Sequence, residues 1–173
     1  RLGVLSLLAC VGLASCTKEK KVFVERPFFD DPPTAAQGFL GFDNADTKMT
    51  VCGNCHIGQQ SKWVGTAHAG AWKTLQDSGH ASASCEPCHT VGPNGNSTSG
   101  AVGYAGVADR RYEDVQCEAC HGPGLVHVQN PDLANTKPSA SIKILDDADH
   151  ATLNCAECHT GVHTPFAEEW AQS

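Results

Sequence analysis

Four copies of the pentapeptide Cys-x-x-Cys-His lie in the sequence. They are Cys52/Cys55/His56, Cys85/Cys88/His89, Cys117/Cys120/His121 and Cys155/Cys158/His159. This spacing is the attachment site of c-type haem, in which the two thiols add to the porphyrin vinyl groups and the adjacent imidazole becomes the proximal iron ligand. A random chain of this composition would hold on the order of 0.03 copies. We therefore predict four covalently attached haem c groups.

Zinc and disulfides are two other uses of paired cysteines. Structural zinc is bound tetrahedrally by Cys-x-x-Cys pairs, and an exported chain could form four disulfide bridges from eight cysteines. Neither use requires a histidine directly after every pair. The four adjacent histidines therefore favour haem.

The other histidines bear on the second axial ligand of each iron. Of the nine histidines four are proximal, and His163 is expected to be a spare. The only methionine, Met49, could give at most one haem Met/His ligation, so we predict mainly bis-histidine ligation. The predicted distal ligands are His68, His80, His127 and His150. The sequence leaves open which of them serves which haem.

The first sixteen residues, RLGVLSLLACVGLASC, form a short apolar stretch behind a basic residue. This is the build of an export signal and is short for a membrane-spanning helix. Its last four residues, Leu-Ala-Ser-Cys, are typical of a bacterial lipoprotein box in which Cys16 is acylated, and a cleaved signal without lipid is the alternative. Because Thr17 rather than Asp follows, we expect an outer-membrane anchor facing the periplasm.

Composition and spacing predict a fold built around its cofactors. The 173 residues would ordinarily form one domain. With 6% aromatic residues, 17 glycines and 9 prolines, the chain is poorly suited to a conventional core, which four haems would complete. Residues 17–50 read as a tether that docks in part. Residues 51–173 are predicted to be mainly α with much irregular loop, organised around four stacked haems.

Three local elements are predicted within this domain. Apolar residues at helical spacing predict a helix over residues 62–75. Pro165 is expected to open a terminal helix, and the glycine-rich residues 92–106 are expected to be a flexible loop. The Gly122-Pro123-Gly124 turn should bring His127 back toward the haems. A sequence echo between the segments around Trp63 and Trp170 further suggests that the natural chain continues past Ser173 to another histidine.

The order of the motifs carries a family resemblance. CGNCH is followed by KWVGTAHAGAW, then by a further Cys-x-x-Cys-His-Thr, then by VQCEACHGPGLVH. Over about residues 51–160 this pattern resembles the cytochrome c554 family of multihaem proteins. The resemblance implies a mostly helical fold, haems packed in alternating parallel and perpendicular pairs, and an electron carrier that accepts electrons from a redox enzyme. One haem of the founding cytochrome lacks a distal protein ligand, and the spare histidines here leave that feature open.

Electron transfer between redox partner proteins, by haem-to-haem hopping outside the cytoplasmic membrane and without catalytic residues, is the leading hypothesis. A multihaem oxidoreductase acting on a small nitrogen or sulfur species at a five-coordinate haem is an alternative, as is a subunit of an extracellular haem filament. The axial ligands distinguish carrier from enzyme. The net charge of −7 argues against nucleic acid as a partner.

Overall fold

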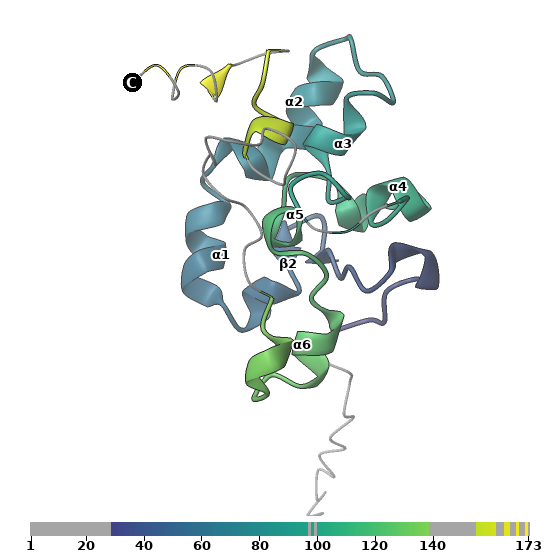
Figure 1. Ribbon diagram of the computed structural model, residues 1–173, viewed down its shortest axis with the longest axis vertical. Helices are drawn as coiled ribbons and strands as arrows, with labels where there is room; N and C mark the ends of the chain where they lie inside the picture. The colour runs from purple at the N-terminus through teal and green to yellow at the C-terminus, as the bar shows by residue number, and fades with distance from the viewer. Residues whose placement is uncertain are drawn as a thin grey trace, which may run out of the picture.

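The computed structural model describes residues 29–96, 98, 100–138, 155–161, 165, 166, 169 and 172. Short helices joined by irregular loops make up most of this structure, with α2 and α3 toward one end, α6 toward the other, and α5 and β2 between them (Figure 1). The α-helices are α1 (Ile57–Trp63), α2 (Ala71–Asp77), α3 (Glu86–His89), α4 (Tyr104–Val107), α5 (Cys117–His121) and α6 (Leu125–Gln129). The prediction of a mainly α, loop-rich fold is confirmed.

Single turns of 3-10 helix and one small sheet complete the described elements. The 3-10 helices are η1 (Thr34–Ala36), η2 (Cys52–Asn54), η3 (Ala67–Gly70), η4 (Arg110–Tyr112), η5 (Ala134–Thr136) and η6 (Cys155–Glu157). Strands β1 (Phe42–Asn44) and β2 (Met49–Thr50) pair antiparallel, with Phe42 opposite Thr50. The Asn44 Oδ1 closes their turn by accepting the backbone N–H groups of Asp46 and Thr47 at 3.0 and 3.1 Å.

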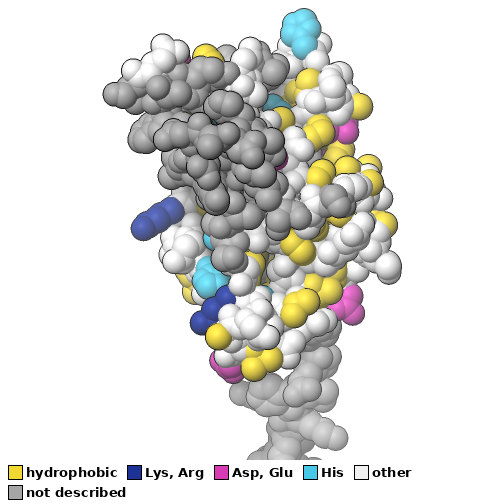
Figure 2. Space-filling view, in the orientation of Figure 1, with side chains coloured by type: hydrophobic (Ala, Val, Ile, Leu, Met, Phe, Trp, Pro, Cys, Tyr) yellow, Lys and Arg dark blue, Asp and Glu magenta, His cyan; other side chains and the backbone are white. Residues whose placement is uncertain are grey.

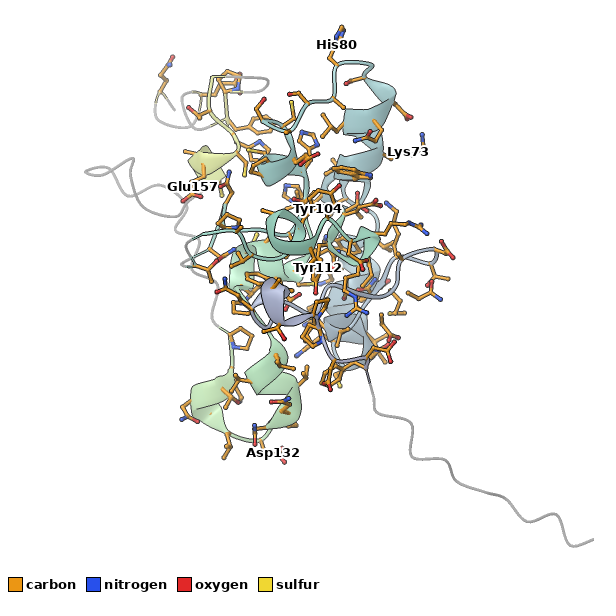
Figure 3. All side chains as sticks on the ribbon, turned by 90° about the vertical axis from the view of Figure 1, so that its right-hand side faces the viewer. Lys73, His80, Tyr104, Tyr112, Asp132 and Glu157 are labelled. Carbon is orange, nitrogen blue, oxygen red and sulfur yellow. The ribbon has the colours of Figure 1, made fainter. Side chains whose placement is uncertain are left out.

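Residues 34–50, which the sequence analysis assigned to a tether, contribute to the core. Ala36 and Phe39 are fully buried in one cluster with Val91, Val102 and Tyr112. The Tyr112 hydroxyl donates a hydrogen bond to the Phe39 carbonyl at 2.8 Å, and burial raises the pKa of Tyr112 to about 12. Tyr112 lies in the middle of the molecule (Figure 3). The segment before the first motif is therefore fixed to the centre of the fold.

The helix predicted over residues 62–75 is wrong as a single element, because the chain breaks after Trp63. The Trp63 carbonyl accepts both the N–H and the hydroxyl of Thr66, at 2.9 and 2.7 Å, and these bonds close the end of α1. A second helix, α2, starts at Ala71. Because of this break, the Trp63 indole can donate to the Val115 carbonyl at 2.9 Å, and α2 can bury its own side chain Leu75.

Of the glycine-rich residues 92–106, the described ones up to residue 103 form a loop, and Tyr104 begins α4. Val102 and Asn96 are fully buried. The Asn96 amide donates to the Gly92 carbonyl and its Oδ1 accepts the N–H of Thr98. At the other end, the Tyr104 N–H bonds to the Val91 carbonyl at 2.8 Å. The loop thus supplies a core side chain.

Several sequence-based predictions fall on residues outside the described ranges. These are Cys16, His150, His163 and most of the terminal helix, for which the described residues show one helical bond, from the Glu169 N–H to the Pro165 carbonyl at 2.9 Å. None of the helices in the described part of the chain is both long and apolar enough to cross a membrane.

Replacement of Gly41 by alanine should destabilise the fold strongly. Gly41 has φ +70°, and an added Cβ would lie 2.3 Å from the Arg111 carbonyl oxygen. Gly79 has the same φ with open space around it, so Gly79→Ala is a matched control for backbone strain alone. We expect Gly79→Ala to lower the free energy of unfolding of the holoprotein by about 1 kcal/mol and Gly41→Ala to lower it by about 3 kcal/mol, as measured by thermal unfolding. Equal losses of stability in the two variants would contradict the close approach of Gly41 to the Arg111 carbonyl.

Candidate haem-attachment site

Each of the four motifs folds as one helical turn. In the first and fourth, the histidine N–H bonds to the carbonyl of the first cysteine at 2.9 Å, for His56 with Cys52 and for His159 with Cys155. The second and third motifs lie on α3 and α5. Positions i, i+3 and i+4 of a helical turn share one face. Both thiols and the imidazole of a motif can therefore meet one porphyrin.

The first motif lies against the third. The Cys52 and Cys117 thiols lie close enough to interact, and this interaction raises the pKa of Cys52 and lowers the pKa of Cys117 to about 7. Once haem is attached both sulfurs are thioethers and no longer titrate. What persists is the proximity of the two attachment points.

The second motif lies against the fourth in the same way. The Cys88 thiol donates to the Glu157 carbonyl at 3.8 Å. It also interacts with the Cys158 thiol, which lowers the pKa of Cys88 to about 6 and raises the pKa of Cys158. The Glu157 carboxylate accepts the N–H of Gly95 at 2.8 Å, which fastens the fourth motif to the loop after the second. The turn of the fourth motif lies beside α3 (Figure 1). Electrostatic interaction of Cys120 with Cys155 links the third motif to the fourth.

His127 faces the proximal histidine of the first motif. The ring centroids of His56 and His127 are 6.4 Å apart and the rings are nearly parallel, at 28°. Metal–imidazole bonds of about 2 Å would put two rings on opposite sides of one ion about 6 Å apart. The turn at Gly122, with φ +77°, leads into α6, which carries His127. Its Nδ1 is buried and has no hydrogen-bond partner among the described residues. The centroid separation of this pair matches that distance.

His68 faces the proximal histidine of the fourth motif. The ring centroids of His68 and His159 are 5.9 Å apart at 41°, and Phe166 packs 5.2 Å from the His159 ring. Burial, and then the neighbouring His159, lower the pKa of His68. A lowered pKa favours the neutral imidazole that binds metal. His68 lies on η3, whose position is fixed by a bond from the Val115 N–H to the His68 carbonyl at 3.1 Å.

The second motif shows how its proximal histidine is oriented. The His89 Nδ1 lies 2.7 Å from the Ala71 carbonyl oxygen at the start of α2. A proton on Nδ1 would donate to this carbonyl and leave Nε2 for the iron, as metal-binding histidines commonly require. The break between α1 and α2 therefore places a carbonyl where the second site needs one.

Not every predicted distal ligand is brought to a motif. His80 is exposed, and its side chain points away from one end of the molecule (Figure 3). Among the described residues no ring contact pairs His80 with a proximal histidine. His150 lies outside the described ranges, so His80 and His150 stay predictions from the sequence.

The described residues fit haem better than the other uses of cysteine. No three His, Cys, Asp or Glu side chains of the described ranges converge as a zinc site would require, and the eight motif cysteines are free thiols. Large apolar side chains are exposed beside the histidines, with Ile57 next to His56 and Val126 next to His127. Hydrophobic side chains are also scattered along the face in Figure 2 from one end to the other. A porphyrin is a large apolar disc that would cover such side chains.

Glu118 is a site residue to which the sequence analysis assigned no role. Its fully buried carboxylate accepts the N–H groups of Leu40, Gly41 and Gly124, at distances of 2.7 to 2.9 Å. These bonds connect the third motif to the segment before β1 and to the turn before α6. The signal in the sequence was a carboxylate between two haem cysteines and ahead of Gly-Pro-Gly, but the partners are distant in the sequence and could not be read from it.

Four helical Cys-x-x-Cys-His turns, two of them with a second imidazole beside the proximal one, are the features of a c-type cytochrome, which binds haem covalently. Residues 51–122 match the family model described as cytochrome c554 and c-prime. The match spans the first three motifs and confirms the resemblance to the cytochrome c554 family seen in the sequence. No curated protein and no solved structure matched the chain.

Removal of a facing histidine should open one iron. In both His127→Ala and His68→Ala, we expect one haem to become high-spin and to bind carbon monoxide after reduction, because one axial ligand is lost. Absorption and EPR spectra of the holoproteins measure this change. His80→Ala tests the sequence-based prediction for that residue, and its spectra stay unchanged if His80 remains at the surface. Unchanged spectra in His127→Ala would rule out the first pairing.

Proposed function

We propose that this protein is a tetrahaem c-type cytochrome that carries electrons between redox partner proteins outside the cytoplasmic membrane. The match of residues 51–122 to the cytochrome c554 family model supports covalent haem c and a role in electron transfer. The observation that carries the finer proposal is the contact between attachment motifs, first with third and second with fourth. Sites in contact suit electron hopping and need no substrate pocket.

Each part of the chain has a defined task in this proposal. Haem c, when bound, supplies one-electron chemistry at iron. Cys52, Cys55, His56 and His127 would hold the first haem, and Cys155, Cys158, His159 and His68 the fourth. The interactions between the motifs support a series of sites in the order first, third, fourth and second. The two ends of this series are the natural points for a donor and an acceptor.

Location and anchoring are part of the proposal. An apolar signal that ends in Leu-Ala-Ser-Cys supports acylation at Cys16 and a position on the periplasmic side of the outer membrane. Export is also consistent with haem c, which is attached outside the cytoplasmic membrane. The net charge of −7 favours a redox partner with a basic docking face over nucleic acid.

Haem content and carbon monoxide binding test the carrier function. We expect four haems per chain, all low-spin, rapid reversible oxidation and reduction, and no spectral change when the gas is added to the reduced holoprotein. Binding of the gas by one haem in four would instead favour an oxidoreductase with a five-coordinate site. The fourth motif lies beyond the family match and needs its own test. The double variant Cys155→Ser, Cys158→Ser should lose one haem, because neither thioether bond can form without the thiols. Retention of all four would exclude that motif as an attachment site.

Cys16→Ser tests the anchor. Without the thiol no acyl chain can be added, so the cytochrome should move from the membrane fraction to the soluble periplasmic fraction. Cys10→Ser is the matched control. Cys10 lies within the signal that is cleaved off, so this variant should stay in the membrane fraction. Fractionation and fatty-acid labelling measure both variants. Labelled, membrane-bound Cys16→Ser would exclude Cys16 as the acylated residue.

A further inference from the structure

Glu118 lies between two haem cysteines and differs from Glu86 and Glu157 of the other motifs in being fully buried. Its side chain is fully buried, and no Lys, Arg or His of the described residues forms an ion pair with it. The three backbone N–H groups that it accepts stabilise the ionised form, whereas burial disfavours it. Burial dominates and raises the pKa of Glu118 to about 7, where a carboxyl can gain and lose its proton near neutral pH.

Few other titratable groups face this carboxyl. From its own helix and from η2 these are Cys117 and Cys52, which become uncharged thioethers when haem is attached. From η4 it is the Tyr112 hydroxyl, whose raised pKa keeps it protonated. The donor segments 39–41 and 122–124 contain no charged side chain. The charged or titratable side chains that remain on these elements are Arg110 and Arg111 of η4 and His121 of α5. None of the three forms an ion pair with Glu118 among the described residues, and none of these elements carries a second carboxylate.

Glu118 lies next to two haem-attachment sites, those of the first and third motifs. It follows Cys117 directly in the chain, and it interacts electrostatically with Cys52 of the first motif. Each electron that enters a haem adds a negative charge. A nearby negative charge disfavours an ionised carboxylate, and low local polarity strengthens this repulsion. Reduction of the first or third haem should therefore favour the protonated form of Glu118.

We infer that Glu118 couples electron transfer to proton transfer, binding a proton from water when the first and third haem pair is reduced and releasing it on oxidation. The inference rests on the proposed electron-carrier function. An external one-electron donor reduces one ferric iron to ferrous, and the carboxylate becomes a carboxylic acid. No other bond forms or breaks, and oxidation reverses both changes.

The test is the pH dependence of the reduction potential of the holoprotein, measured by spectroelectrochemistry between about pH 6 and 9. Because the reduced state binds the proton more tightly, the potential of the pair should fall as the pH rises. The slope approaches about 59 mV per tenfold change in proton concentration between the carboxyl pKa values of the oxidised and reduced states. Glu118→Gln is neutral at every pH, so it should lose this component and have the higher potential at alkaline pH.

Glu86→Gln is the matched control, because Glu86 occupies the same position of the second motif but is only half-buried. This variant should keep the slope. Infrared difference spectra should also show the carbonyl band of a carboxylic acid on reduction of the unchanged protein, and Glu118→Gln should lack it.

Three outcomes would overturn the inference while the electron-carrier function stands. They are a flat potential in the unchanged protein, a slope retained by Glu118→Gln, and a slope lost equally by Glu86→Gln. The first needs no variant, so it decides the matter even if Glu118→Gln does not fold. Haems that cannot be reduced and reoxidised reversibly would instead overturn the carrier function itself.

Discussion

The Glu118 carboxylate holds together three stretches of chain that are far apart in the sequence. It binds backbone N–H groups of the segment before β1 and of the turn before α6 from within the third motif. Buried N–H groups that lose their acceptor are costly, so these three stretches depend on one side chain. The position of His127 opposite His56 depends in turn on the turn before α6. A single buried carboxyl group thus connects an attachment site to the turn that carries a facing imidazole.

Much of the site could be predicted from the sequence because its information is local. Five adjacent residues specify a haem-attachment turn, and each of the four motifs folds as one. The mainly helical, loop-rich character followed from short spacings and many glycines. The resemblance to the cytochrome c554 family rested on such local strings and is confirmed for residues 51–122.

What could not be predicted depends on contacts between distant residues. The break after Trp63 uses the Thr66 hydroxyl, and apolar spacing alone cannot distinguish one long helix from two short ones. Phe39 looked like part of a tether because its burial needs Tyr112, which comes far later in the chain. The contacts of Cys52 with Cys117 and of Cys88 with Cys158 likewise have no local signature.

The facing histidines also bear on how the chain unfolds. Iron bound between His56 and His127 would close a loop over residues 56–127, and iron between His68 and His159 would close another over residues 68–159. The two loops overlap, so neither could open fully while the other stayed closed. Cross-links of this kind reduce the conformational entropy of the denatured chain, as disulfides do. Ligand exchange at iron would then set the rate at which this cytochrome comes apart under heat or mechanical force.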